Sequence, residues 1–254
     1  METNILEKQM RRWPLYGGGL ALLQAGLLAG CDRTPEIPAP PPATNPATNI
    51  VSPTTAQVAT TPAPRGPERL ILAFGDSLYA GYGLDRGQSL PDALQNRLRK
   101  DGINATIVNA GVSGDTSAAG RQRFAFALDS MKRKPDLILL GLGGNDVLRQ
   151  ISPDETRANM TAMMAEAKRR SIPVMLTGMM APPNLGPEYS RRFNSIWTDL
   201  ARSYHATLYP FILDGVIGDA GLMQADHVHP NRTGVDRIAA RVAPLVETAL
   251  GGRK

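Results

Sequence analysis

The 254-residue sequence is poor in the residue types that form disulfides and metal sites: it has one cysteine, Cys31, and three histidines. A single cysteine excludes an intramolecular disulfide framework and a multi-cysteine metal site. Aromatic residues make up only 5% of the chain, but hydrophobic residues make up 42%, which is enough to bury one good core. We therefore expect one folded domain that depends on its apolar core alone.

The sequence also lacks a long basic stripe, although its formal net charge is +5. Five basic and four acidic residues precede Glu68, so 23 basic and 19 acidic residues remain, spread over the predicted helices. Nucleic-acid binding requires a basic stripe with interleaved aromatic residues. The charge pattern therefore indicates a solvated surface, and we expect no nucleic-acid partner.

The amino terminus has the layout of an export signal. Basic residues at positions 8–12 precede an apolar, glycine-rich run at positions 13–30, which ends in Leu28-Ala29-Gly30-Cys31. This pattern resembles the bacterial lipobox, which implies cleavage after residue 30 and lipidation of Cys31. Two alternatives stay open: an incidental thiol, and an uncleaved anchor, although the run is shorter than the roughly 20 apolar residues of a spanning helix. We expect an exported lipoprotein, anchored to a membrane on the periplasmic side of the cell envelope.

Residues 31–67 follow the signal at positions 1–30 and are dominated by proline, alanine and threonine. Because such a segment has almost no bulky apolar side chain to bury, we expect a disordered tether, partly in polyproline II conformation. We expect it to act either as a spacer that lets the folded domain search its surroundings or as a passive linker. The folded domain is predicted at residues 68–254.

Strand-length apolar runs alternate with amphipathic helical stretches through this domain. Strict alternation predicts an α/β fold, with a parallel sheet covered by helices on both faces. Ligands bind at the carboxyl ends of the strands in such sheets. The runs predict strands at residues 70–74, 105–109, 136–140, 173–176 and 207–212, and helices at 91–100, 116–131, 152–167, 188–204 and 233–250.

Two local patterns sharpen the helix predictions. Ser152, Pro153 and Glu155 match a capping box, in which the serine and glutamate bond to each other's main-chain N–H groups. In the same helix a stripe of methionines and Ala167 at helical spacing indicates core packing rather than a cofactor site.

Ser77 ends the first apolar run in a tight turn, where an α/β hydrolase exposes its nucleophile. A serine needs a general base, and that base needs an orienting acceptor. Asp226 lies three residues before His229, so its carboxylate can accept from Nδ1 while Nε2 faces the serine. His227 is the alternative base, and a polar structural turn or a two-histidine metal site is the alternative role of this segment. His205 is more simply a surface or capping residue.

An attack on an acyl carbonyl also needs hydrogen-bond donors where negative charge develops. The main-chain N–H groups of Ser77 and Gly114 and the side-chain amide of Asn145 are the candidates. Each follows a predicted strand, so the three should meet at one edge of the sheet. Their alternative roles are those of ordinary turn residues.

Four segments together resemble the blocks of the GDSL or SGNH hydrolase superfamily: Phe74-Gly-Asp-Ser-Leu78, Gly114, Gly143-Gly-Asn-Asp146 and Asp226-X-X-His229-Pro. The similarity spans residues 69–250 and is greatest to the bacterial arylesterase, lysophospholipase and acyl-CoA thioesterase group. The resemblance implies a three-layer flavodoxin-like sandwich with a five-stranded parallel sheet of order 2-1-3-4-5. It also implies a Ser77, Asp226 and His229 triad, an oxyanion hole of Ser77, Gly114 and Asn145, and no metal or organic cofactor.

The sequence therefore predicts a monomeric serine esterase that cleaves carboxylic ester or thioester bonds of small or lipid acyl substrates through an acyl-serine intermediate. An O-acetylesterase acting on envelope polysaccharide or peptidoglycan is the alternative enzyme, and a non-catalytic binding lipoprotein is the alternative outside enzymes. The apolar loop after the fourth strand, which includes Met180, Ala181 and Pro182, is predicted to contact the acyl group.

Overall fold

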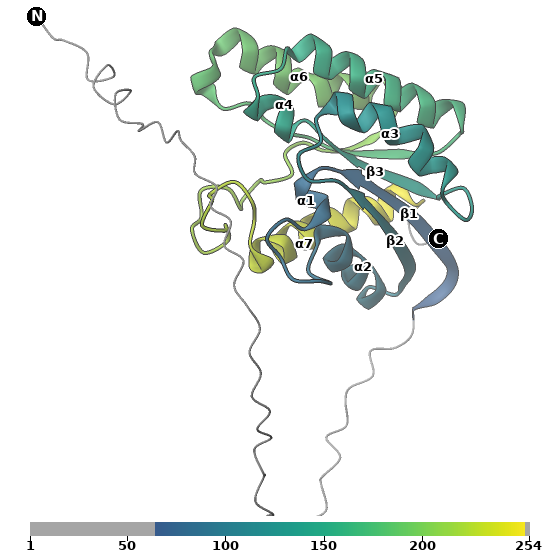
Figure 1. Cartoon of the computed structure of the whole chain (residues 1–254). Coiled ribbons are helices and arrows are strands. Elements are labelled where there is room, and N and C mark those ends of the chain that lie inside the picture. The colour runs from purple at the N-terminus through teal and green to yellow at the C-terminus, as the bar shows by residue number, and fades with distance from the viewer. Residues whose placement is uncertain (1–63, 252–254) are drawn as a thin grey trace, which may run out of the picture. The chain divides into compact units, whose positions relative to one another are not determined.

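The computed structural model describes residues 64–251, so the predicted signal, Cys31 and almost all of the predicted tether lie outside the described residues. The described chain contains a five-stranded parallel sheet with the order β2-β1-β3-β4-β5 (Figure 1). The predicted fold class and strand order are therefore confirmed. The strands are β1 (Arg65–Gly75), β2 (Ile103–Gly111), β3 (Leu137–Gly141), β4 (Val174–Thr177) and β5 (Thr207–Tyr209).

Helices cover both faces of this sheet. In Figure 1, α3, α5 and α6 lie on one face, whereas α2 and α7 lie together on the other. Three short helices, α1, α4 and the 3-10 helix η2, lie in the connections. The helices are α1 (Ser77–Ala80), α2 (Leu90–Lys100), α3 (Ser117–Asp129), α4 (Gly144–Leu148), α5 (Pro153–Arg169), η2 (Pro183–Leu185), α6 (Pro187–Tyr204) and α7 (Arg232–Ala249).

The central strands are buried on both faces, and this explains their unbroken apolar sequences. Every residue of β3 is buried, as are residues 70–75 of β1, because helices cover both sides of the parallel sheet. The edge strands β2 and β5 contain partly exposed residues. The inward stripes of the helices are buried as predicted, among them Met160, Met163, Met164 and Ala167 of α5 and Phe193, Ile196, Trp197 and Leu200 of α6.

Two local predictions are corrected. Ser152 is the N-cap of α5, but its side chain accepts from the main chain of Asp154, and no reciprocal bond from Glu155 is found among residues 64–251. The full capping box is instead at α2, where Ser89 and Asp92 satisfy each other's main-chain N–H groups.

The fifth strand is also shorter than the predicted residues 207–212. β5 ends at Tyr209, whose carbonyl accepts from the N–H of Gly178 at 2.8 Å. Pro210 follows and has no N–H to donate to a sheet. The chain then turns, and Ile212 donates to the carbonyl of Gly178 at 2.9 Å.

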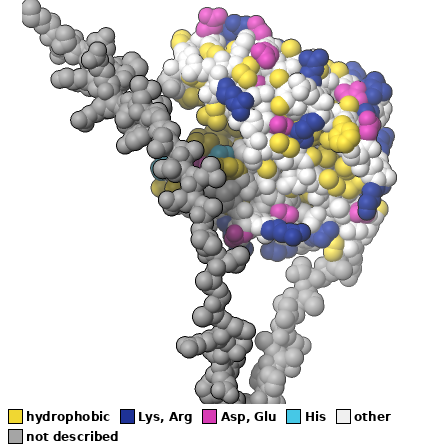
Figure 2. Space-filling model, in the orientation of Figure 1, with side chains coloured by type: hydrophobic (Ala, Val, Ile, Leu, Met, Phe, Trp, Pro, Cys, Tyr) yellow, Lys and Arg dark blue, Asp and Glu magenta, His cyan; other side chains and the backbone are white. Residues whose placement is uncertain are grey.

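Figure 2 shows the basic side chains of one face of the domain interspersed with acidic ones. None of the helices in residues 64–251 combines the length and the apolar character that a membrane span requires. The predicted membrane anchor lies outside these residues and stays a prediction.

Candidate active site

Three glycines lie side by side where the central strands end. In the register of the sheet, Gly75 of β1 pairs with Gly111 of β2 and with Gly141 of β3. A Cβ atom on Gly75 would lie 2.6 Å from the carbonyl oxygen of Gly141, and one on Gly111 would lie 2.3 Å from the main-chain nitrogen of Ala80. The absence of side chains therefore lets α1 pack directly on the strand ends.

This packing places Ser77 at the first position of α1, immediately above the sheet. Asp76 is the N-cap, and its Oδ1 accepts from the N–H of Leu78 at 3.1 Å. Tyr79 of the same helix is buried, and its hydroxyl hydrogen-bonds to the hydroxyl of Thr177 at 2.9 Å. The turn that carries Ser77 is thus fixed at both β1 and β4.

His229 and Asp226 come from the loop before α7. The Asp226 carboxylate accepts from the N–H groups of Val228 and His229, each at 3.0 Å, and lies 2.7 Å from His229 Nδ1. With Nδ1 donating to this carboxylate, Nε2 is free to accept a proton. It lies 2.9 Å from Ser77 Oγ.

The hydrogen bonds from His229 and Val228 hold the pKa of Asp226 down at about 2. Carboxylates that accept several main-chain hydrogen bonds are stabilised in the charged form. Asp226 is therefore an anion throughout the neutral range, which favours the tautomer that places the proton on Nδ1 of His229.

The other two histidines are placed differently. His205 is the exposed C-cap of α6 in a left-handed conformation, with φ 52°. His227 lines the pocket beside Ser77, but among residues 64–251 its ring makes no hydrogen bond to Ser77 or Asp226. No group of three or more His, Cys, Asp and Glu side chains in that range is placed to hold a metal ion.

The predicted oxyanion donors converge on the same pocket. Ser77 opens α1, where the first N–H groups have no acceptor within the helix. Gly114 lies in the loop after β2 with φ +88°, a left-handed conformation that favours glycine. Asn145 is the second residue of α4, and its Nδ2 donates to the carbonyl of Asp115 at 3.0 Å, which orients its amide.

A buried network that sequence reasoning missed holds Asn145 in place. The neighbouring Asp146 is fully buried and accepts from the N–H of Ser117 at 2.7 Å, from the hydroxyl of Ser117, and from that of Thr156 at 2.9 Å. Asn159 donates to the Ser117 hydroxyl at 3.1 Å. These bonds join α3, α4 and α5 behind the site. The sequence offered one signal of this network, namely Asp146 itself, a charged residue in an apolar, glycine-rich segment.

A second buried acid lies next to the nucleophile. Asp76 is 2% exposed, and desolvation by burial raises its pKa to about 6, against the hydrogen bond from Leu78 and the attraction of His229. Its side chain lines the pocket. Asp76 belongs to the Phe74-Gly-Asp-Ser-Leu78 motif, but its burial does not follow from that motif.

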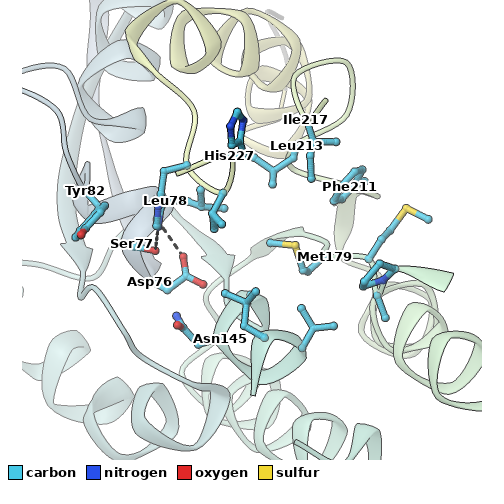
Figure 3. Close-up of a pocket in the computed structure, with 18 of the residues that line it drawn as sticks. Asp76, Ser77, Leu78, Tyr82, Asn145, Met179, Phe211, Leu213, Ile217 and His227 are labelled. Atoms are coloured by element: carbon cyan, nitrogen blue, oxygen red, sulfur yellow. Dashed lines mark hydrogen bonds between the residues drawn. The ribbon is translucent and has the colours of Figure 1, made fainter. Parts of the chain in front are cut away.

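The pocket above Ser77 has a volume of about 550 Å³ and two chemically different walls. Figure 3 shows Asp76, Ser77 and Asn145 on one side and Met179, Phe211, Leu213 and Ile217 on the other. The predicted acyl contacts Met180, Ala181 and Pro182 all line it. Phe211, Leu213 and Ile217 were missed, because Phe211 fell inside the strand predicted at residues 207–212 and the other two follow it in a segment without helical or strand periodicity.

Comparison with known proteins shows the family of this chain. The model of the GDSL-like Lipase/Acylhydrolase family matches residues 73–237. Esterase TesA of Pseudomonas aeruginosa is 38% identical over 180 residues, which cover 71% of this chain and 89% of that protein. The Arylesterase of Vibrio mimicus is 36% identical over 173 residues, which cover 68% and 86%.

A solved structure shows the same similarity. AlinE4, described as an SGNH-hydrolase family esterase, is 53% identical with a TM-score of 0.62, and the match covers 73% of this chain and 98% of that one. The family match spans more than half of the chain, and it includes both Ser77 and His229. The resemblance seen in the sequence is confirmed, and the chain belongs to the GDSL-like lipase/acylhydrolase family of serine ester hydrolases.

Proposed function

We propose that this protein hydrolyses carboxylic ester or thioester bonds through an acyl intermediate on Ser77. The observation that carries the proposal is the chain of two short contacts, 2.7 Å from Asp226 to His229 Nδ1 and 2.9 Å from His229 Nε2 to Ser77 Oγ. In this arrangement His229 is the general base and Asp226 orients it and stabilises its charged form.

The first half-reaction transfers the acyl group to the enzyme. Ser77 Oγ attacks the carbonyl carbon while its proton moves to His229 Nε2. The resulting oxyanion is stabilised by the N–H groups of Ser77 and Gly114 and by the Asn145 amide, and loss of one such donor costs about 3 to 4 kcal/mol of barrier. When the intermediate collapses, the bond to the leaving group breaks and His229 protonates that group.

The second half-reaction releases the acid. Water loses a proton to His229 Nε2 and attacks the acyl-Ser77 carbonyl, and the same donors stabilise the second oxyanion. Collapse breaks the bond to Ser77 Oγ, which regains its proton from His229. Asp226 keeps its charge throughout, consistent with its lowered pKa.

The apolar wall of the pocket supports acyl chains longer than acetyl. Five of the eight large apolar side chains that are exposed within residues 64–251 line this one pocket: Tyr82, Leu148, Met180, Ile217 and Val228. Exposed apolar patches of this kind mark ligand-binding sites. We infer that the chain of the acyl group lies along Met180, Ala181 and Pro182 and continues towards the rim.

The test is a chain-length profile of p-nitrophenyl esters from acetyl to palmitoyl, measured with the wild type and Ser77→Ala. We expect a maximum beyond acetyl and loss of turnover in the folded variant. Unchanged hydrolysis by purified Ser77→Ala would refute the nucleophile. A profile confined to acetyl would favour the alternative O-acetylesterase.

We further propose that the enzyme acts as an exported lipoprotein anchored through Cys31. The support is the lipobox-like Leu28-Ala29-Gly30-Cys31 sequence. Metabolic labelling with a palmitate analogue should mark the wild type and not Cys31→Ser, and equal labelling of both would overturn the anchor.

A further inference from the structure

The catalytic groups proposed above lie on two segments that are far apart in the sequence. Ser77 opens α1, which ends in a turn at residues 81–84, whereas Asp226 and His229 lie in the loop at residues 223–230. The hydrogen bonds between Asp226 and His229 are internal to that loop. They orient the imidazole within the loop, but they do not fix the distance from the loop to α1.

Gln224 joins these two segments. Its Nε2 donates to the carbonyl of Tyr82 at 2.7 Å and to the carbonyl of Pro230 at 3.0 Å. Its main-chain N–H donates to the carbonyl of His229 at 2.8 Å. One half-buried side chain therefore contacts both ends of the histidine loop and the turn after α1.

The hydrogen bond from Gln224 to Tyr82 is one of only two that join these two segments in the described structure. Between residues 76–84 and residues 223–231, the described structure has two hydrogen bonds: this one and the contact of His229 Nε2 with Ser77 Oγ. The second is the contact that must form and break during catalysis. Gln224 therefore supplies the hydrogen bond that persists when the proton moves.

The turn at residues 81–84 leaves space for the side-chain amide of Gln224, because residue 83 is a glycine. Gly83 has φ +70°, and a Cβ atom there would lie 2.1 Å from Gln224 Oε1. The ring of the adjacent Tyr82 lies against the imidazole of His229, with centroids 4.6 Å apart and planes 38° apart. Tyr82 thus touches Gln224 through its main chain and His229 through its side chain.

We propose that Gln224 is a positioning residue that holds His229 at proton-transfer distance from Ser77 by tying the histidine loop to the carbonyl of Tyr82. This inference rests on the proposed roles of Ser77 and His229. Since reacting groups must be held within a narrow range of geometry, a displacement of about 1 Å costs on the order of 100-fold in rate.

The test compares kcat and KM for p-nitrophenyl acetate among the wild type and five variants. Gln224→Met keeps the length of the side chain without a donor, and Gln224→Lys keeps a donor of similar reach. We expect Gln224→Met to lower kcat by about 10- to 100-fold with little change in KM, and Gln224→Lys to recover most of the loss. Gln122→Met, which alters an exposed glutamine of α3, is the matched control and should retain wild-type kcat.

Gly83→Ala places a methyl group against the side-chain amide of Gln224 and displaces it. This variant takes the place of Gln224→Met in the test if that protein does not fold. It should also lower kcat with KM unchanged. Wild-type kcat in a folded Gln224→Met or Gly83→Ala protein, with Ser77→Ala inactive in the same assay, would overturn the positioning role alone. Activity retained by Ser77→Ala would instead overturn the proposed function. A Gln224→Lys protein as slow as Gln224→Met would show that the donor is not what matters, and would also reject the inference.

Discussion

The two walls of the pocket are built in different ways. The wall that carries Ser77 and Asn145 rests on the starts of α1 and α4, which side-chain hydrogen bonds hold to β4 and to the loop after β2, with the fully buried Asp146 behind it. The opposite wall consists of loops after β4 and β5, where Met180 and Ile217 are 48% and 50% exposed. Within this wall the N–H of Ala181 donates to Asn194 Oδ1 at 2.7 Å.

This difference separates chemistry from selectivity. Proton transfer and oxyanion stabilisation need donors and acceptors at fixed distances, and buried hydrogen-bond networks provide them. Contact with an acyl chain needs only apolar area, which is not directional. Substitutions in the polar wall should therefore change the rate by orders of magnitude, whereas those in the apolar wall should change the preferred chain length modestly.

The largest effect is expected from the acid of the proposed triad. Asp226→Asn should lower kcat by roughly 10³- to 10⁴-fold, because an amide does not hold His229 in the required tautomer or stabilise its charged form. Steady-state kinetics with a p-nitrophenyl ester measure this. His227→Ala is the matched control and should stay within a few-fold of the wild type. A loss in His227→Ala as large as that in Asp226→Asn would make His227 the base.

The next largest effect is expected when one donor of the proposed oxyanion hole is removed. Asn145→Ala removes one neutral donor, and we expect kcat to fall by about 10²- to 10³-fold with little change in KM. Asn104→Ala is the control, because Asn104 lies near the start of β2 and does not line the pocket. It tests whether loss of an asparagine side chain elsewhere also lowers kcat. If Asn145→Ala raised KM and left kcat intact, the residue would bind substrate rather than the oxyanion.

The buried Asp76 predicts a dependence of stability on pH. Its folded pKa of about 6 lies above the ordinary value of 3.8, so the protonated form favours the folded state. Its contribution to stability is full below about pH 4 and is lost as the pH rises through 6. Asp76→Asn should therefore raise the free energy of unfolding at pH 8 by at most roughly 3 kcal/mol, with no gain at pH 4. Urea unfolding at both pH values measures the difference, and an equal effect at both would contradict this assignment.

The smallest effect is expected in the apolar wall. Ile217→Ser should lower the ratio of octanoyl to acetyl ester hydrolysis by roughly 3- to 10-fold, which corresponds to about 1 kcal/mol of apolar contact. Phe126→Ser changes a 75% exposed apolar side chain that does not line the pocket, and it should leave the ratio unchanged. If both substitutions lowered this ratio equally, the apolar wall would not be what sets the preferred chain length.

The sequence predicted what depends on local patterns. β3 is recognisable because burial of both faces requires an unbroken apolar run, and the three-residue spacing of Asp226 and His229 lets one turn join carboxylate and imidazole. The end of β5 was predicted three residues too late, because the apolar residues beyond it pack in the core without belonging to a strand.

Long-range contacts outside the predicted catalytic set were beyond sequence reasoning. Gln224 and the carbonyl of Tyr82 are 142 positions apart, and nothing in either segment indicates that they meet. The same holds for Ser117 and Asp146, which belong to different helices and meet only because β2 and β3 flank β1. Pairing of this kind follows from the packed fold and not from the composition of either segment.

The central claim, an acyl group carried on Ser77, is tested most directly by mass spectrometry of the protein quenched in acid within the first turnovers of a p-nitrophenyl ester. The account predicts one acyl adduct, located on the peptide that contains Ser77 and lost in Ser77→Ala. An adduct on another residue, or an equal yield from Ser77→Ala, would contradict it.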